Sequence, residues 1–170
     1  SHLNASGCII PAPGATSGLG YPYIWGTAST MWGGSGNVTT PTAVKSLWNM
    51  TAPVKEICVD WNTIHYIDSL GNMYGCGYNT FGEVGNGQEF VGKYNYSSWP
   101  SYSWTFTDYE NPSGKPVQIG AGIKWKHLYS NNWFGFYKYA MDENDSIYSW
   151  GRNKSLALGN GLWNGYDGGE

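Results

Sequence analysis

Few residues of this chain have types and spacings that suit catalysis. Hydrolysis of a glycosidic bond needs two carboxylates that face each other across the bond, about 5 to 9 Å apart. The carboxylates that qualify by type alone, with no spacing that forces them together, are Asp60, Glu83, Asp108 and Glu110. No nucleophile elbow, phosphate-binding loop or dinucleotide fingerprint occurs. The sequence therefore predicts no catalytic residues and no enzyme activity, with a carbohydrate-active hydrolase as the minor alternative.

Residues that ligate metals are equally scattered. The histidines are His2, His65 and His127, and the cysteines are Cys8, Cys58 and Cys76. The histidines form no triad or metal pattern, and the cysteines fit no metal-ligand spacing. His65 falls in an expected strand and is interpreted as a core or edge residue. Cys58 and Cys76 either pair or remain free and buried, and the second interpretation is favoured. We expect no metal and no cofactor.

The strongest binding signal is an aromatic segment over residues 88–111, which holds eight aromatic residues in 24. Long loops with their own aromatic content are usually functional, and Tyr, Trp, Ser and Asn are the mixture favoured in recognition loops. A second aromatic insertion is expected within residues 124–133. The candidate ligand-binding residues are Trp99, Tyr102, Trp104, Trp133, Tyr94 and Tyr96. The alternative is that these aromatics are buried against a neighbouring blade or subunit.

Composition limits the fold and the partners. Charged residues make up 12% of the 170 residues, aromatic residues 17%, and there are 25 glycines. This mixture suits short strands joined by tight turns, with aromatic rings between sheets. The net charge is −3 and Arg152 is the single arginine, so no basic surface for nucleic acid is expected. No apolar run reaches about 18 residues, which argues against membrane insertion.

An internal repeat organises the chain. Residues 68–87 and 142–161 align at an offset of 142 − 68 = 74, and a weaker copy lies upstream at an offset of 77 − 26 = 51. Such self-similarity indicates an array of like units. The recurring motif residues are Gly77, Asn79, Gly85, Gly87, Gly151, Asn153, Gly159 and Gly161. We interpret them as structural: the asparagines bond their own loop backbone, and the recurring Asp68 and Asp142 are turn residues.

Each complete unit is predicted to hold four strands. In the second unit these cover residues 53–59, 64–67 and 73–77, and a short outer strand begins at 81–85. In the third unit they cover 116–119, 136–141, 146–150 and 156–159. The offset between the two units grows from 117 − 54 = 63 to 74, which predicts an insertion of about a dozen residues after the first strand. In the first unit no convincing strand precedes Tyr21.

This pattern resembles the regulator of chromosome condensation repeat. Proline-valine is followed by Asp-x-x-Gly, then by an aromatic residue, glycine and asparagine, then by Gly-x-Gly. The resemblance implies an all-β fold, a β-propeller-like array of four-stranded antiparallel blades with about three units in an incomplete ring. The sequence departs from the pattern at Ala28, Cys76 and Asp145, where asparagine, tryptophan and glycine are expected. A closed seven-bladed ring would need about twice this length. The chain is therefore expected to be part of a longer protein, which is favoured, or to complete the ring with further copies, or to stay open and pack on a partner.

The expected domain plan has three parts. An N-terminal extension covers residues 1–20, and a tail or continuation covers 164–170. The repeat domain covers 21–163, with units at 21–52, 53–113 and 114–163 and the aromatic insertion at 88–111.

The leading functional hypothesis is a non-catalytic recognition or adhesion module that binds a glycan or protein receptor. Its expected location is extracellular, at a cell surface or on a virion. The alternative is a structural component of a phage tail fibre or surface appendage, whose aromatic insertions bind sister subunits. The resemblance to this repeat family also implies nucleotide exchange on a small GTPase, the activity of the protein that gives the family its name. That activity would need basic loops, which this chain lacks.

Overall fold

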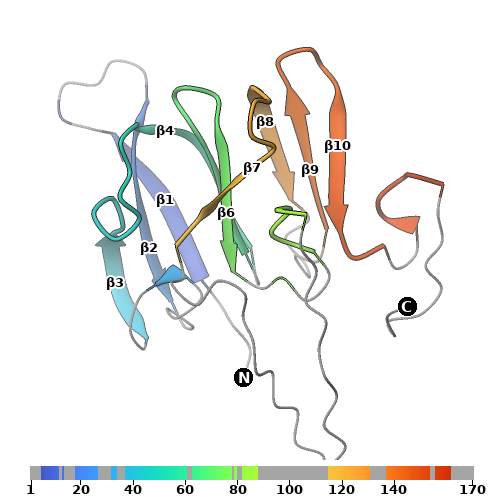
Figure 1. Ribbon diagram of the computed structural model, residues 1–170. Helices are drawn as coiled ribbons and strands as arrows, with labels where there is room; N and C mark the ends of the chain where they lie inside the picture. Colours follow the sequence, from blue (N-terminus) through green and yellow to red (C-terminus); the bar gives the residue numbers. More distant parts are fainter. Residues whose placement is uncertain are drawn as a thin grey trace, which may run out of the picture.

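The computed structural model describes residues 5–11, 13, 18–26, 32–33, 37–60, 63–77, 79, 82–87, 115–130, 137–153 and 156–161. These ranges contain ten β-strands and no α-helix, which confirms the all-β prediction. Within them, no helix has the length and apolar character needed to span a membrane. Figure 1 shows the strands as three blades side by side, called here blades 1, 2 and 3 in chain order, from the blue strands near the N-terminus to the orange strands near the C-terminus.

Blade 2 is a four-stranded antiparallel sheet. It contains β4 (Val54–Val59), β5 (Thr63–Asp68), β6 (Met73–Gly77) and β7 (Val117–Ile119), paired in that order. The turn between β5 and β6 is closed by the Asp68 carboxylate, whose Oδ1 accepts hydrogen bonds from Leu70 N and Asn72 N, both at 2.9 Å. This local side-chain bonding is the reason that aspartate marks the turn.

Blade 3 repeats the first three strands of blade 2. It contains β8 (Trp125–Ser130), β9 (Tyr137–Asp142) and β10 (Ile147–Gly151). Asp142 Oδ1 accepts from Asn144 N at 2.8 Å and from Ser146 N at 2.9 Å, as Asp68 does one unit earlier. Asp145 occupies the position of Gly71, and both adopt positive φ, 63° and 79°. Asparagine and aspartate tolerate this left-handed conformation better than other non-glycine residues, so the turn survives the substitution.

Blade 1 contains β1 (Ala5–Pro11), β2 (Gly20–Gly26) and β3 (Val38–Ala43). β2 pairs with β1 along its whole length and with β3 on its other edge. A single antiparallel bridge between Gly20 and Val54 joins β2 to β4, so blades 1 and 2 form one seven-stranded sheet.

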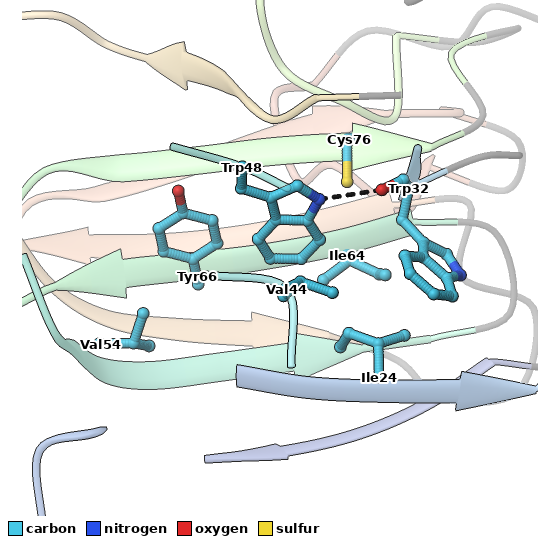
Figure 2. Close-up of a cluster of buried hydrophobic side chains, with 8 residues drawn as sticks. All are labelled: Ile24, Trp32, Val44, Trp48, Val54, Ile64, Tyr66 and Cys76. Carbon is cyan, nitrogen blue, oxygen red and sulfur yellow. Dashed lines mark hydrogen bonds between the residues drawn. The ribbon is translucent and has the colours of Figure 1, made fainter. Parts of the chain in front are cut away.

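Two apolar clusters hold adjacent blades together. The cluster between blades 1 and 2 is shown in Figure 2 and contains Ile24, Trp32, Val44, Trp48, Val54, Ile64, Tyr66 and Cys76. The cluster between blades 2 and 3 contains Ile67, Met73, Ile119, Trp125, Leu128 and Ala140. Because the faces of the blades are buried against each other, the array is stabilised mainly at these boundaries.

A tryptophan indole donates to a backbone carbonyl at each boundary. Trp48 Nε1 donates to Trp32 O at 2.9 Å between blades 1 and 2, as Figure 2 shows. Trp150 Nε1 donates to Glu83 O at 3.0 Å between blades 2 and 3. The two acceptors occupy equivalent positions, since 83 − 32 = 51 is the repeat offset. Each indole therefore joins apolar burial to a directional bond.

Five strand predictions are wrong. The segment predicted as the first strand of the third unit forms β7, which pairs with β6 and completes blade 2. The predicted insertion at 124–133 contains β8, the true first strand of blade 3. A strand, β1, also precedes Tyr21. In addition, residues 82–85 and 156–159 form turns in place of the predicted outer strands.

The pairing register corrects the alignment of the units. Both first strands shift register against their partners at the same place, between Val54 and Glu56 and between Trp125 and His127. The first strands therefore align at an offset of 125 − 54 = 71, and the second strands at 137 − 63 = 74. Only three residues are inserted between these strands, in place of the dozen predicted.

Candidate functional site

The strands β4, β6, β8 and β10 all end at one end of the blades, called here the loop end (Figure 1). Residues 78–116 follow β6 and residues 131–136 follow β8, so both segments that carry the predicted ligand-binding residues attach at this end. The predicted residues themselves lie outside the described residues: Trp99, Tyr102, Trp104, Trp133, Tyr94 and Tyr96. Their role as ligand-binding residues stays a prediction.

A buried ion pair lies at the loop end between blades 2 and 3. Lys138 Nζ in β9 is 2.8 Å from Asp60 Oδ2, and both side chains are fully buried. Asp60 Oδ1 also accepts from Thr63 N at 2.9 Å, and Asp60 Oδ2 accepts from Ser130 Oγ at 2.9 Å. One carboxylate thus joins the β4–β5 connection to the end of β8 and to β9. Partners on several sides are what a buried carboxylate needs to remain charged.

His65 lies beside this ion pair in β5. Its side chain is fully buried, and Nε2 donates to Val84 O at 3.1 Å. Nδ1 has no hydrogen-bond partner among the described residues. Burial, and then the positive charge of Lys138, lower the pKa of His65 to about 4. The ring is therefore neutral near pH 7 and packs edge-on against Trp150 at a centroid distance of 5.8 Å.

The titratable groups at the loop end are buried or half-buried. Cys58 is a half-buried free thiol whose pKa is raised by its burial. Of the four candidate carboxylates, Asp60 and Glu83 are buried, and Asp108 and Glu110 lie outside the described residues. Within the described ranges, no group of three or more His, Cys, Asp or Glu side chains is placed to hold a metal ion.

An exposed polar and aromatic strip runs along β8 toward the loop end. Tyr129 is 49% exposed, and its ring lies 6.2 Å from that of the exposed His127. Glu56, from β4, accepts from Leu128 N at 3.0 Å and lies 3.4 Å from His127 Nδ1. Glu56 carries no signal in the sequence, because 71 residues separate it from its contact with His127 on β8. We call Glu56, His127 and Tyr129 the β4–β8 strip.

The loops that follow β6 and β10 have the same internal bonds. Asn79 Oδ1 accepts from Val84 N at 3.0 Å, and Asn153 Oδ1 accepts from Leu158 N at 3.1 Å. The Nδ2 of each asparagine donates to a second asparagine seven residues on, Asn86 or Asn160, at 3.2 Å in both loops. The recurring asparagines therefore fix the shape of the loop after the third strand of a blade.

The glycines of the loop motif lie in the same loops or at the strands that lead into them. Those at or beside the first loop are Gly77, Gly85 and Gly87, and those at or beside the second are Gly151, Gly159 and Gly161.

Acidification is expected to destabilise the protein through His65. In the unfolded chain His65 binds a proton near its ordinary pKa of 6.5, whereas in the folded protein it does so only at about pH 4. Between these two pH values the unfolded state binds more protons than the folded state. The contribution of the neutral, buried His65 to the free energy of unfolding is therefore fully present above pH 6.5 and is lost as the pH falls toward 4. It amounts to at most roughly 3 kcal/mol.

Urea unfolding between pH 4 and 8 measures this dependence. His65→Gln should flatten the fall in stability below pH 6.5 relative to the unsubstituted protein. His127→Gln, at an exposed position, is the matched control and should keep the decrease in the free energy of unfolding below pH 6.5. If that decrease were unchanged in His65→Gln, groups other than His65 would cause it.

Solved structures with a similar fold are RCC1-type proteins. Prp20p from Saccharomyces cerevisiae, described with its binding to Gsp1p and histones, matches with a TM-score of 0.61 and 20% identity over 85% of this chain and 32% of that chain. Yeast RCC1 (Prp20) in complex with Kap60 matches with a TM-score of 0.61 and 19% identity over 85% and 31%. Human WBSCR16 matches with a TM-score of 0.55 and 15% identity over 85% and 33%.

The chain thus has the fold of part of an RCC1-type propeller and spans about a third of the length of these solved chains. No protein-family model matches the sequence, and a comparison with curated proteins finds no match. The expected location outside the cell or on a virion is contradicted, because RCC1-type proteins, which share this fold, are typically intracellular.

Proposed function

We propose that this chain is a non-catalytic binding module that recognises a protein partner at the loop end of blades 2 and 3. The observation that carries the proposal is the buried Asp60–Lys138 pair at the point where the two aromatic segments attach. Functional loops work best when a rigid scaffold holds their ends. A charge pair whose carboxylate contacts β5, β8 and β9 supplies such a scaffold.

The described surface next to the loop end supports a protein partner. The β4–β8 strip presents an aromatic ring, an imidazole and a carboxylate together, and tyrosine is enriched at protein interfaces. Yeast Prp20, which has a similar fold, is described with its binding to Gsp1p and histones and in complex with Kap60. For this chain we propose only the class of partner, a protein, bound through aromatic side chains from the two segments that follow β6 and β8 and from the β4–β8 strip.

Affinity capture with matched variants tests the proposal. The immobilised chain is compared with Trp99→Ala/Trp104→Ala and with His127→Ala/Tyr129→Ala, and retained proteins are identified by mass spectrometry and their affinities measured. Removal of an interface anchor costs about 2 kcal/mol or more, so each variant should weaken binding at least about tenfold. Leu70→Ala, an exposed position at the opposite end of blade 2, is the control and should bind normally.

Thermal unfolding separates recognition from packing. If residues 88–111 serve recognition, Trp99→Ala/Trp104→Ala should leave the melting temperature nearly unchanged. A large loss of stability would instead place these side chains in the core. Unchanged affinity for the partner in both Trp99→Ala/Trp104→Ala and His127→Ala/Tyr129→Ala would reject the proposal. Binding of soluble glycans, with no protein retained, would change the proposed class of ligand from protein to glycan.

A further inference from the structure

His65 helps to hold the loop after β6 at the boundary between blades 2 and 3. Its Nε2 donates to Val84 O, and its ring packs edge-on against Trp150 of blade 3. Trp150 Nε1 in turn donates to Glu83 O, the neighbouring carbonyl of the same loop. A histidine of blade 2 and a tryptophan of blade 3 therefore hold residues 82–87, from which the first predicted binding segment continues.

Blade 1 fills the position of the imidazole with an aliphatic side chain. In blade 2, His65 lies opposite Gly75, and a Cβ on Gly75 would lie 2.7 Å from the imidazole ring. The equivalent pair in blade 1, at the repeat offset of 75 − 24 = 51, is Gly7 opposite Ile24. There the large side chain lies on the other strand, is fully buried and would be 2.6 Å from a Cβ on Gly7. Packing at a blade boundary therefore does not require a histidine.

Blade 3 keeps the bond to its loop but makes it with a phenol. Tyr139 lies opposite Ser149, at an offset of 139 − 65 = 74 from His65. Its hydroxyl donates to Ala157 O in the loop after β10. Burial raises the pKa of this hydroxyl, so it keeps its proton far above neutral pH. Of these three equivalent positions, the one in blade 2 carries the group that gains a proton in mild acid.

A proton added to the imidazole has no partner in the closed loop. Because Nε2 donates to Val84 O, the added proton goes to Nδ1, which is buried and has no hydrogen-bond partner among the described residues. The new charge also lies near the cation of Lys138, which with burial lowers the pKa of His65. A buried donor without an acceptor and a buried charge near a like charge both destabilise the closed form. Protonation therefore favours a form in which water reaches Nδ1.

The groups that face His65 from the neighbouring elements do not neutralise this charge. Asp60, in the β4–β5 connection, favours the protonated ring, but its carboxylate is already paired with Lys138 of β9 and bonded to Ser130 of β8. Cys58 of β4 lies opposite His65 in the register, and burial raises the pKa of its thiol, so it supplies no negative charge. The remaining elements contribute Gly75 of β6, Ile119 of β7, Trp150 of β10 and the buried Glu83 of the loop.

We propose that His65 is a pH switch for this loop: its neutral ring holds residues 82–87 against blade 3, and its protonated ring releases them. The closed loop keeps Nδ1 from water, whereas an opened loop exposes it, so added protons shift the equilibrium toward the open form. An effect of the switch on partner binding rests on the proposed function, because the loop leads into the loop end. The switch itself requires no partner.

The indole protons of two tryptophans allow the switch to be measured within one molecule. Trp150 Nε1–H donates across the boundary between blades 2 and 3. Trp48 Nε1–H donates across the boundary between blades 1 and 2, where Ile24 takes the place of the imidazole. When closing is fast, hydrogen exchange of each indole proton, followed by NMR, reports its opening equilibrium. The ratio of the two rates removes the dependence of the chemical exchange step on pH.

The ratio of the Trp150 rate to the Trp48 rate should rise as the pH falls. The pKa of His65 is 6.5 where the ring is in water and about 4 in the closed loop. Linkage between these two values gives an increase of about 20-fold in the ratio between pH 7 and pH 5.

Two variants remove the proton site while the boundary stays filled. His65→Gln keeps a donor for Val84 O, so the ratio should stay constant between pH 7 and pH 5. His65→Gly/Gly75→Ile gives blade 2 the pair that blade 1 has, and it should also hold the ratio constant. His127→Gln, which changes an exposed histidine, is the control and should keep the full increase.

The proposal would be overturned by any of three outcomes. In the first, the ratio does not rise in the unsubstituted chain. In the second, the rise persists in His65→Gln, which would assign it to another buried acid such as Glu83. In the third, both indole protons accelerate equally, which would mean that the whole chain unfolds. Because the exchange measurement uses no partner, its failure is distinct from a failure of the proposed binding function.

Discussion

Replacement of Lys138 by methionine is expected to lower the free energy of unfolding by about 3 to 5 kcal/mol. The substitution removes the buried cation 2.8 Å from Asp60 and leaves a buried carboxylate without its charge partner. The remaining bonds from Thr63 and Ser130 do not neutralise it. Urea unfolding at pH 7, monitored by tryptophan fluorescence, measures the loss.

Two matched variants show whether the loss comes from the uncompensated charge. Asp60→Asn/Lys138→Met removes both charges and keeps an acceptor for Thr63, so much of the stability should return. Lys126→Met breaks the exposed pair with Asp145, whose side chains are 43% and 69% exposed, and should cost no more than about 1 kcal/mol. A loss below about 1 kcal/mol in Lys138→Met would mean that water or rearrangement satisfies Asp60.

Trp125→Ala should destabilise the protein by a similar amount, about 3 to 5 kcal/mol. Trp125 is buried between blades 2 and 3, donates to Ile119 O and meets the Tyr148 ring edge-on at 5.0 Å. The truncation leaves a cavity at the blade boundary and a carbonyl without its donor. Thermal unfolding measures the change, and Trp125→Phe should show a smaller loss because most of the apolar volume is kept.

Tyr129→Ala is the control on the same strand. Tyr129 points to solvent from β8, so its truncation should change stability by less than about 1 kcal/mol. If Trp125→Ala were instead neutral for stability and harmful for partner binding, the predicted recognition role of residues 124–133 would be correct and the packing assignment wrong.

Local signals in the sequence predicted the strands that tight turns delimit. β6 was expected at residues 73–77 and has these bounds, because Asp68 and Gly71 fix the turn before it. β9 and β10 lie within one residue of their predicted positions for the same reason. Here the information resides in four or five neighbouring residues, and tertiary contacts only reinforce it.

The wrong predictions concern partners that are distant in the chain. Three residues, Val117 to Ile119, carry an extended pattern, but nothing in them tells whether they begin one blade or complete the previous one. The sequence places Trp125 in an aromatic insertion, because the match of Val117 with Val54 assigns the first strand of the third unit to β7 and leaves β8 outside the repeat. Pairing choice and bulges depend on packing between blades, which a single sequence does not encode locally.

The framework of the candidate site was only partly accessible to prediction. The aromatic segments are visible in composition, whereas the pairing of Asp60 with Lys138 spans 78 residues and leaves no spacing to detect. One signal was present: along β9, Lys138, Ala140 and Asp142 alternate with half-buried residues, and all three are buried. Period-two alternation places a lysine on the same face as an alanine, which argues that the lysine is paired inside.

The position of β7 has a consequence for how the chain opens and for how it can be cut. β7 belongs to the sheet of blade 2 and is joined by a short turn to β8 of blade 3, so blade 3 cannot move away from blade 2 without straining the pairing of β7 with β6. Their backbone amides should therefore exchange with deuterium as one cooperative unit, with Met73 and Leu128 protected to the same degree. A truncation before Lys115 leaves blade 2 with three strands, whereas one after Gly122 keeps it whole. At this boundary the unit that the sequence repeats and the unit that the structure folds are thus offset by one strand, and this offset links blade 2 to blade 3.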